Sequence, residues 1–403
     1  MTDQPSTMIA SGAGQDHLPV IDALRGYAIL LVIAVHTLGH VPDLVWPVKR
    51  IMAMGFYGVQ LFFLASAVTL MMSWNRSTGP IPQRSLKFMV RRFFRIAPLY
   101  WMAVFFYWFA YEMQPEQFSA QLLLATLFFY NAWSPYLIPT VSGWTPVPGG
   151  WSIGVEFCFY LLFPLIATVA TNLCRSLLFF AISLLVMLAA SHFGQGFYPE
   201  IGGEERSNFL YFWPPNQLVI FSLGILLYHL ASDESLSRRI AESRISADGA
   251  SLAMICAMLA IALSLGLNKF FDWERAAPPT HLVMSVCFAL WALVLLIKPS
   301  GWVVNRAIAG LGTVSFSAYV LHFALLKYIG SFLHLSWPFG KTGLQSIAFE
   351  ATFVVLTVLA VRVVAGVTYR VIEQPFIAIG KRLLCRRPRA LEAHATQNPG
   401  PPR

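Results

Sequence analysis

The chain has 403 residues, of which 57% are hydrophobic and 12% are charged. Soluble domains usually carry about 25% charged residues, so this composition excludes an ordinary soluble protein and indicates a membrane protein. The net charge of +9 at pH 7 would by itself be compatible with nucleic-acid binding. The basic residues, however, cluster at the ends of apolar stretches, as orientation in a membrane requires. We therefore expect no nucleic acid as a partner, and the five cysteines show no pattern of a metal site.

Long apolar stretches follow one another along the chain. A bilayer core about 30 Å thick needs about 20 apolar residues per helix. The stretches that approach this length are residues 20–40, 52–73, 94–112, 118–133, 151–172, 176–193, 214–231, 249–267, 281–298, 312–333 and 345–368. The sequence therefore predicts an all-α, polytopic integral membrane protein.

The distribution of basic residues decides which stretches cross the membrane. If the shortest one, 118–133, also crossed, the arginines of 238–244 and those of the C-terminal tail would lie outside, against the positive-inside rule. We therefore predict ten transmembrane helices, with 118–133 re-entrant or interfacial and both chain ends in the cytoplasm. Residues 1–17 then form a cytoplasmic tail, 18–380 the membrane domain, and 381–403 a basic, disordered cytoplasmic tail.

Two ionisable residues stand out in the first helix. Ionisable residues inside apolar helices are costly, which makes them candidates for function. Arg25 lies near the inner end, and His36 lies eleven residues further on, about 16 Å along a helix. Arg25 is placed to bind an anionic group at the cytoplasmic face, and His36 lies at or beyond mid-membrane. Helix orientation by Arg25 and helix packing by His36 are the alternative explanations for each residue alone.

The third helix opens with a cluster of arginines. Arg92 and Arg95 are three residues apart and so share one side of the helix. A guanidinium group binds phosphate bidentately, although an anchor at the membrane surface would also explain them. Further on, PGGWSIGVEF places Trp151, Ser152 and Glu156 at the outer start of a spanning helix. A structural partnership of Glu156 with a histidine or arginine is the alternative to a functional role.

Polar residues also mark the last two crossings. The segment SFSAYVLHF places Ser315, Tyr319 and His322 in the ninth crossing, with His322 near mid-membrane. Helix packing or water binding is the alternative reading for His322. In the last crossing, Arg362 lies inside the inner end and Glu373 just beyond it. These two side chains are expected to form an ion pair that fixes the helix.

These motifs resemble those of the acyltransferase family 3 proteins, membrane O-acyltransferases that modify surface glycans. The resemblance covers about residues 18 to 380, and the five short motifs are specific because they occur together and in order. They are Arg-x10-His, R-x-x-R followed by proline, W-S-[IL]-x-x-E, S-x-x-x-Y-x-x-H and I-E-x-P. The matching residues are Asp22, Arg25, His36, Arg92, Arg95, Pro98, Trp151, Ser152, Glu156, Ser315, Tyr319, His322, Glu373 and Pro375. The chain shows no appended soluble esterase-like domain, so it resembles the stand-alone members.

The resemblance implies transfer of an acyl group, usually acetyl from acetyl-CoA, to a hydroxyl, without a metal. The phosphates of cytoplasmic acyl-CoA would bind the cluster Arg25, Arg92 and Arg95. His36 would act as general base on the acceptor hydroxyl, and Glu156 would orient His36 or hold the acceptor. A covalent acyl-histidine is an alternative.

The acceptor implied by the resemblance is a cell-surface or lipid-linked glycan at the bacterial cytoplasmic (inner) membrane. The residues expected to bind it are Trp151, Ser152, Tyr319 and His322. Two alternatives are open. One is a small-molecule acceptor such as a macrolide. The other is a proton-coupled transporter, in which the same buried ionisable side chains would form a path.

Overall fold

The computed structural model describes residues 18–41, 43–113, 118–138, 145–264, 272 and 277–385. Residues 1–17 and 386–403, which hold most of the two predicted tails, lie outside this part of the chain. Within it, every regular element is a helix. The α-helices are α2 (Pro19–Thr37), α3 (Trp46–Ala53), α4 (Gly58–Arg76), α5 (Ile81–Ala110), α6 (Ala120–Leu127), α7 (Gly150–Val169), α8 (Leu173–Gly194), α9 (Gly203–Phe212), α10 (Pro214–Ser232), α11 (Glu234–Glu242), α12 (Ala247–Ser264), α13 (Thr280–Ile297), α14 (Arg306–Thr313), α15 (Ser315–Ser336), α16 (Leu344–Thr368) and α17 (Gln374–Cys385).

Helix length and hydropathy agree with the predicted crossings. Within the described ranges, nine helical segments are long and apolar enough to cross a membrane, or ten if α11 and α12, which meet at 93°, count as one broken span. The prediction of an all-α polytopic membrane protein is therefore confirmed. The predicted crossing 249–267 corresponds to α12, and its last residues, 265–267, lie outside the described chain.

The segment 118–133 does not form a spanning helix. It contains only α6, which has eight residues and is therefore about 12 Å long at 1.5 Å per residue. A bilayer core about 30 Å thick needs more than twice that length. Whether α6 enters the membrane or lies at its surface stays a prediction, as does the orientation of the chain.

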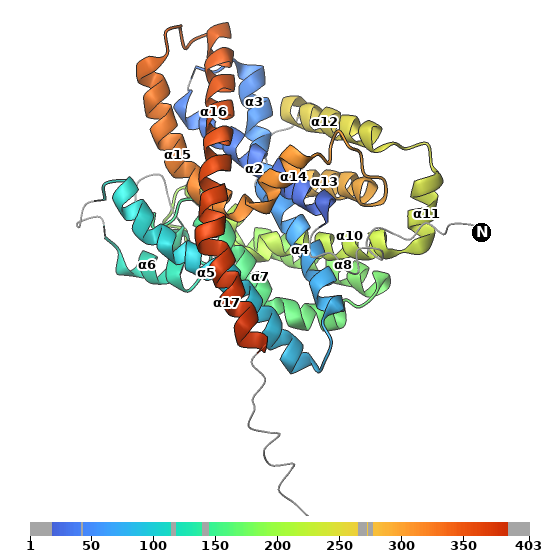
Figure 1. Cartoon of the computed structure of the whole chain (residues 1–403). Coiled ribbons are helices and arrows are strands. Elements are labelled where there is room, and N and C mark those ends of the chain that lie inside the picture. Colours follow the sequence, from blue (N-terminus) through green and yellow to red (C-terminus); the bar gives the residue numbers. More distant parts are fainter. Residues whose placement is uncertain are drawn as a thin grey trace, which may run out of the picture.

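The last two helices form one long rod, visible from top to bottom of Figure 1. Helix α16 continues through a π-helical turn at Tyr369–Glu373 into α17. The expected ion pair between Arg362 and Glu373 is wrong, because eleven residues along a continuous helix separate them by about 16 Å. Helix α17 also extends to Cys385, beyond the start predicted for the tail.

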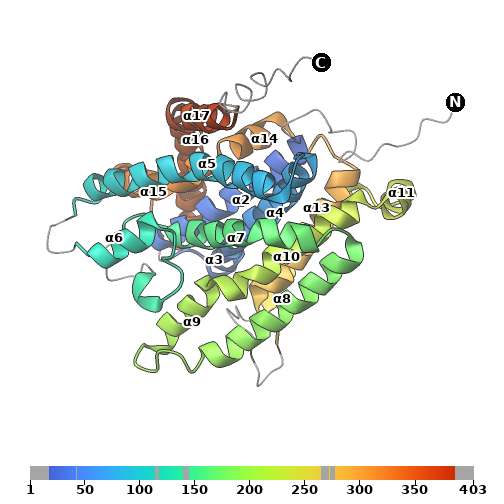
Figure 2. The same cartoon turned by 90° about the horizontal axis from the view of Figure 1, so that it is seen from below.

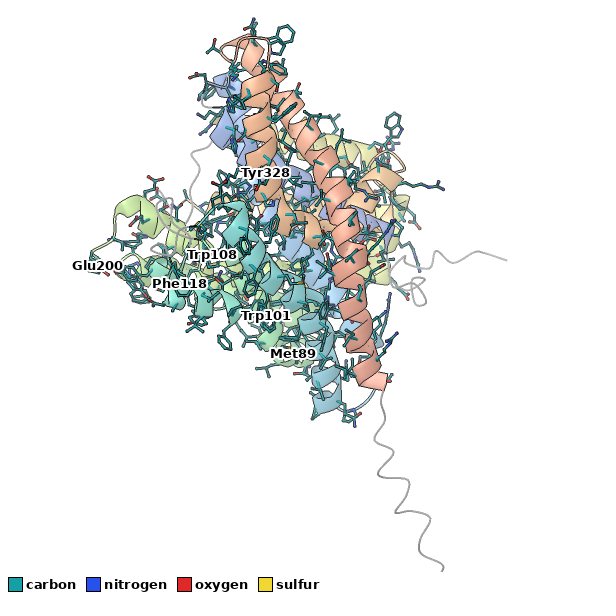
Figure 3. The ribbon with its side chains drawn as sticks, turned by 60° about the vertical axis from the view of Figure 1, so that its left-hand side comes forward. Met89, Trp101, Trp108, Phe118, Glu200 and Tyr328 are labelled. Atoms are coloured by element: carbon teal, nitrogen blue, oxygen red, sulfur yellow. The ribbon has the colours of Figure 1, made fainter. Side chains whose placement is uncertain are left out.

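Large apolar side chains face outwards from the bundle. Phe105 and Phe109 of α5, and Leu161 and Leu165 of α7, are all exposed. Figure 3 shows two half-buried aromatic side chains of α5, Trp101 and Trp108, along one side of the molecule. Such a surface suits lipid rather than water, because hydrocarbon solvates apolar side chains.

Helix α2 lies inside the bundle, where it packs against α4, α14, α15 and α16, as Figure 2 shows. Its contact with α14 is made by backbone. A Cβ atom at Gly312 would lie 1.7 Å from the backbone oxygen of Asp22, and one at Gly26 would lie 2.2 Å from that of Ile308. Small residues allow such close approach of membrane helices. This contact fixes the part of α2 that carries Arg25.

We predict that Gly312→Ala destabilises the protein, because the added methyl group would force α14 away from α2. Overpacking of this kind typically costs about 1–3 kcal/mol. The matched control is Gly202→Ala, where an added Cβ meets nothing within 4 Å. Thermal melting of the detergent-solubilised protein should show a lower midpoint for Gly312→Ala alone. Equal midpoints for the two variants would contradict the close contact.

The predicted orientation can be tested by labelling. In a variant without the five native cysteines, Gly202→Cys should react with a membrane-impermeant maleimide added to intact cells, because residues 200–206 are predicted to lie outside. Ser235→Cys, at the start of α11, should react only after the cells are permeabilised. Labelling of Ser235→Cys in intact cells would refute the predicted topology.

Candidate functional site

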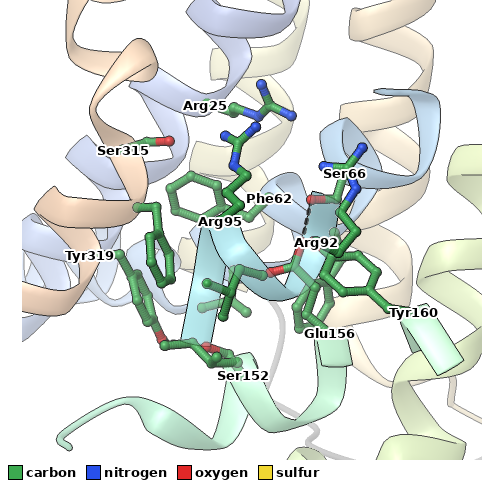
Figure 4. A pocket seen from close by; sticks show the side chains of 15 residues that line it. Arg25, Phe62, Ser66, Arg92, Arg95, Ser152, Glu156, Tyr160, Ser315 and Tyr319 are labelled. Atoms are coloured by element: carbon green, nitrogen blue, oxygen red, sulfur yellow. Dashed lines mark hydrogen bonds between the residues drawn. The ribbon is translucent and has the colours of Figure 1, made fainter. Parts of the chain in front are cut away.

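A cavity of about 70 Å³ lies where α2, α4, α5, α7 and α15 meet. This volume holds several water molecules. Figure 4 shows the side chains that line it. Seven residues that the sequence singled out are among them: Arg25, Arg92, Arg95, Ser152, Glu156, Ser315 and Tyr319. The structure thus brings residues from four of the five motifs to one place.

Two helices supply the cationic side chains of the cavity. Arg92 and Arg95 both line it, which confirms that they share one side of α5. Arg25 of α2 donates a hydrogen bond to Thr69 Oγ1 at 3.0 Å. Its Nη1 atom also lies 3.5 Å from Asp22 Oδ1. Arg25 is therefore partly neutralised within the protein.

Arg92 and Arg95 are less well satisfied. Neither forms an ion pair within 4 Å to any residue that the structure describes. The Nε atom of Arg92 is buried without a hydrogen-bond partner, and its guanidinium group lies near the rings of Phe88 and Tyr160, at 5.6 and 5.8 Å. Guanidinium donors that face a cavity without a carboxylate partner suit an anionic ligand.

Glu156 lies in the same cavity as the arginines. Its Oε1 atom accepts hydrogen bonds from Ser66 Oγ and Tyr160 Oη, both at 2.5 Å. Ser152 and Glu156 are four residues apart on α7, so they share a face, and that face lines the cavity. An orienting contact between Glu156 and His36, which the sequence had suggested, is absent from the described contacts.

A left-handed glycine lets α7 begin close against α15. Gly149 has φ +74°, and a Cβ there would lie 3.0 Å from both Phe323 and the Tyr319 hydroxyl. Through this close approach, Tyr319 Oη donates to the Gly149 carbonyl at 3.0 Å and accepts from Ser152 Oγ at 2.7 Å. Tyr319 of α15, which lines the cavity, is therefore hydrogen-bonded to residues at the start of α7.

His36 and His322 lie outside the lining of the cavity and contact each other. Their ring centres are 5.2 Å apart, and the ring of Phe323 packs against both. The Nδ1 atom of His36 lies 2.7 Å from the Val32 carbonyl oxygen, and that of His322 lies 2.6 Å from the Tyr319 carbonyl oxygen. Because a carbonyl oxygen only accepts, each Nδ1 must carry the proton. Each neutral ring then presents Nε2 as a hydrogen-bond acceptor.

Tyr319 connects this imidazole pair with the cavity, because it lines the cavity and its ring centre lies 5.5 Å from that of His322. His36 is partly exposed, whereas His322 is fully buried. Trp151 takes no part in either group. It is buried against Tyr211 and Phe212, and its ring also lies 6.5 Å from that of Phe63, which lines the cavity. Contact of Trp151 with the acceptor stays a prediction.

Three partners of the site were not identified in the sequence. Tyr160 follows Glu156 by four residues, so helical spacing alone would have suggested it. Ser66 and Thr69 belong to the apolar run of α4, where nothing distinguishes a serine or threonine that serves a ligand site from one that bonds its own helix. Only the packing of α4 against α2 and α7 reveals their role.

The bundle and its site define a class of protein, a polytopic membrane protein with an internal cationic cavity beside two imidazoles. Comparison with known proteins gives the family. The acyltransferase 3 family model, described as an acyltransferase domain, matches residues 18–367. The chain therefore belongs to the acyltransferase 3 family.

Similar proteins occur in Staphylococcus aureus. The chain is 22% identical over 395 residues to "Putative O-acetyltransferase SACOL0978" of strain COL, covering 92% of this chain and 59% of that protein. It is 23% identical over 383 residues to "O-acetyltransferase OatA" of strain NCTC 8325 / PS 47, covering 89% of this chain and 57% of that protein. The chain thus spans less than two thirds of the length of these relatives. No solved structure matches it.

Proposed function

We propose that the protein is an O-acetyltransferase of the bacterial cytoplasmic membrane. It would move an acetyl group from cytoplasmic acetyl-CoA to a hydroxyl of a cell-surface or lipid-linked glycan. The observation that carries the proposal is the cavity in which Arg25, Arg92 and Arg95 converge beside the His36–His322 pair. The family match and the names of the relatives support acyl transfer to oxygen.

The arginines suit the phosphates of the donor. A cavity of about 70 Å³ admits one phosphate or part of the pantetheine arm, so the adenosine end would lie outside it. Along α2, His36 lies about 16 Å beyond Arg25, a span comparable to an extended pantetheine arm. A donor held at Arg25 would thus present its thioester near His36, past Tyr319.

His36 would be the general base. Its Nδ1–H bond to the Val32 carbonyl leaves Nε2 free to take the proton of the acceptor hydroxyl. The hydroxyl oxygen attacks the thioester carbonyl, the C–S bond breaks, and the proton passes from the imidazolium to the thiolate of CoA. His36 suits this role better than His322 because it is partly exposed, whereas Nε2 of His322 is enclosed.

The alternatives differ in what supports them. The family match favours an acyltransferase over a proton-coupled transporter. A small-molecule acceptor such as a macrolide would use the same donor site, and a covalent acyl-histidine would use the same imidazole. A different acceptor changes the acetylated product, so analysis of the products separates that alternative. An acyl-histidine leaves the product unchanged, and mass analysis of the protein after incubation with acetyl-CoA alone would detect it.

We predict that Arg92→Lys weakens acetyl-CoA binding about tenfold, which corresponds to about 1.4 kcal/mol. Lysine keeps the positive charge but loses the bidentate geometry. The matched control is Arg91→Lys, because Arg91 precedes Arg92 on α5 and is exposed outside the cavity. Calorimetry on the purified protein should show a raised Kd for Arg92→Lys only. Equal affinities in both variants would argue against a phosphate site at Arg92.

We predict that His36→Ala lowers acetyl transfer by about 10²–10⁴, the usual effect of removing a general base, and leaves acetyl-CoA binding intact. Mass analysis of surface glycans should find the acetyl group in cells with the wild type. It should be missing with His36→Ala and without the protein, at equal amounts of inserted protein. His229→Ala serves as control, since His229 bonds the Ala170 carbonyl away from the site. Wild-type acetylation by His36→Ala would remove His36 from the mechanism.

A further inference from the structure

Glu373 is a buried carboxylate that the proposed mechanism does not use. It ends the π-helical turn between α16 and α17 and is 3% exposed. Its Oε1 atom accepts hydrogen bonds from the backbone N–H of Ser317, at 3.0 Å, and from the Ser317 hydroxyl. Turns of this type are frequent at functional sites.

The contact caps a second helix from outside. Ser317 belongs to the first turn of α15, where backbone N–H groups have no partner within the helix. The residue that precedes α15, Val314, supplies no side-chain cap. Glu373, which ends the π-helical turn after α16, therefore supplies the side-chain cap of α15. Its negative charge also suits the positive end of the helix dipole.

The contact lies on the back of α15. At 3.6 residues per turn, Ser317 is about 200° around the helix from Ser315 and from Tyr319. Those two residues line the cavity, and His322, on the same side, contacts His36. Glu373 thus holds α15 from the side opposite to the one that carries the site.

Glu373 is also linked to the cationic part of the cavity. Helix α17 packs closely on α5, since a Cβ at Gly380 would lie 2.9 Å from Phe94. Phe94 precedes Arg95, so this contact lies next to one of the arginines that line the cavity. The stretch from Glu373 to Gly380 therefore contacts both α15 and α5, the helix that carries Arg92 and Arg95.

We propose that Glu373 is a positioning residue for acyl transfer, which fixes the rotation and depth of α15 so that Tyr319 and His322 keep their places beside Ser152 and His36. This inference rests on the proposed function. It concerns the transfer step rather than donor affinity, because the hydrogen bonds of Glu373 go to α15 and not to the cavity.

Three variants test the role in purified, reconstituted protein with acetyl-CoA. Glu373→Ala removes both hydrogen bonds and should lower kcat about 10–100-fold, because a displacement of about 1 Å can cost about 10² in rate. The KM for acetyl-CoA should change less than about threefold, since the arginines stay in place.

Glu373→Gln should keep kcat within about threefold of the wild type, because its amide oxygen still accepts both bonds. Glu204→Ala, an exposed carboxylate on α9, should match the wild type.

Ser317→Ala keeps the hydrogen bond from the backbone N–H to Glu373 and loses only the one from the hydroxyl. It should therefore lower kcat at least about threefold at unchanged KM. A threefold loss corresponds to about 0.7 kcal/mol, because a factor of ten corresponds to about 1.4 kcal/mol. This variant decides the matter if Glu373→Ala does not fold. Any of three outcomes would overturn the proposal. They are an unchanged kcat in Ser317→Ala, equal impairment of Glu373→Gln and Glu373→Ala, and an effect confined to KM.

Hydrogen–deuterium exchange makes the test independent of activity. Amides of the first turn of α15 should exchange faster in Glu373→Ala than in Glu373→Gln or the wild type, because only the alanine variant frees the N–H of Ser317. Equal exchange in all three would refute the positioning role. A wild type that fails to transfer acetyl from acetyl-CoA would instead refute the proposed function, while the exchange result still decides the role of Glu373.

Discussion

Solvation of buried charge is the constraint on which the rest of this structure depends. Hydrocarbon offers no hydrogen bonds, so a charge between membrane helices needs protein groups, water or a ligand around it. Glu156 is solvated by Ser66 and Tyr160, and Glu373 by Ser317. Arg92 and Arg95 have no such complement among the described residues. In the proposed function, the phosphates of the donor would meet this demand.

Two helices each serve both parts of the site. Helix α2 carries Arg25 into the cavity and His36 into the imidazole pair, and α15 does the same with Tyr319 and His322. A shift of α2 would therefore disturb Arg25 and His36 together, and a shift of α15 would disturb Tyr319 and His322 together. This explains why both are held by contacts that tolerate little movement, α2 by the backbone contact at Gly26 and α15 by the N-terminal cap that Glu373 supplies.

Local spacing accounts for the residues of the site that the sequence revealed. Arg92 and Arg95 were placed on one side of α5 because helical periodicity depends only on sequence separation, and both line the cavity. The same reasoning fails between helices. Glu156 was expected to orient His36 or to hold the acceptor, with pairing to a histidine or arginine as the alternative. It lies among the arginines of the cavity, and no contact with His36 is described. The ion pair expected between Arg362 and Glu373 was wrong because eleven residues separate them by about 16 Å along one helix, and Glu373 bonds Ser317 of α15.

The sequence by itself determined the class of this protein and most of its helices. Apolar length and the distribution of charge follow from the thickness and polarity of a bilayer, so these two features of the sequence suffice to find the apolar spans and to set 118–133 apart from them. Only the tertiary structure decided which polar residues meet. Ser66, Thr69 and Ser317 become partners of buried charges through the rotation and close approach of neighbouring helices. The rotation of each helix and its distance from its neighbours result from the packing of whole helix faces, and no short motif encodes that packing.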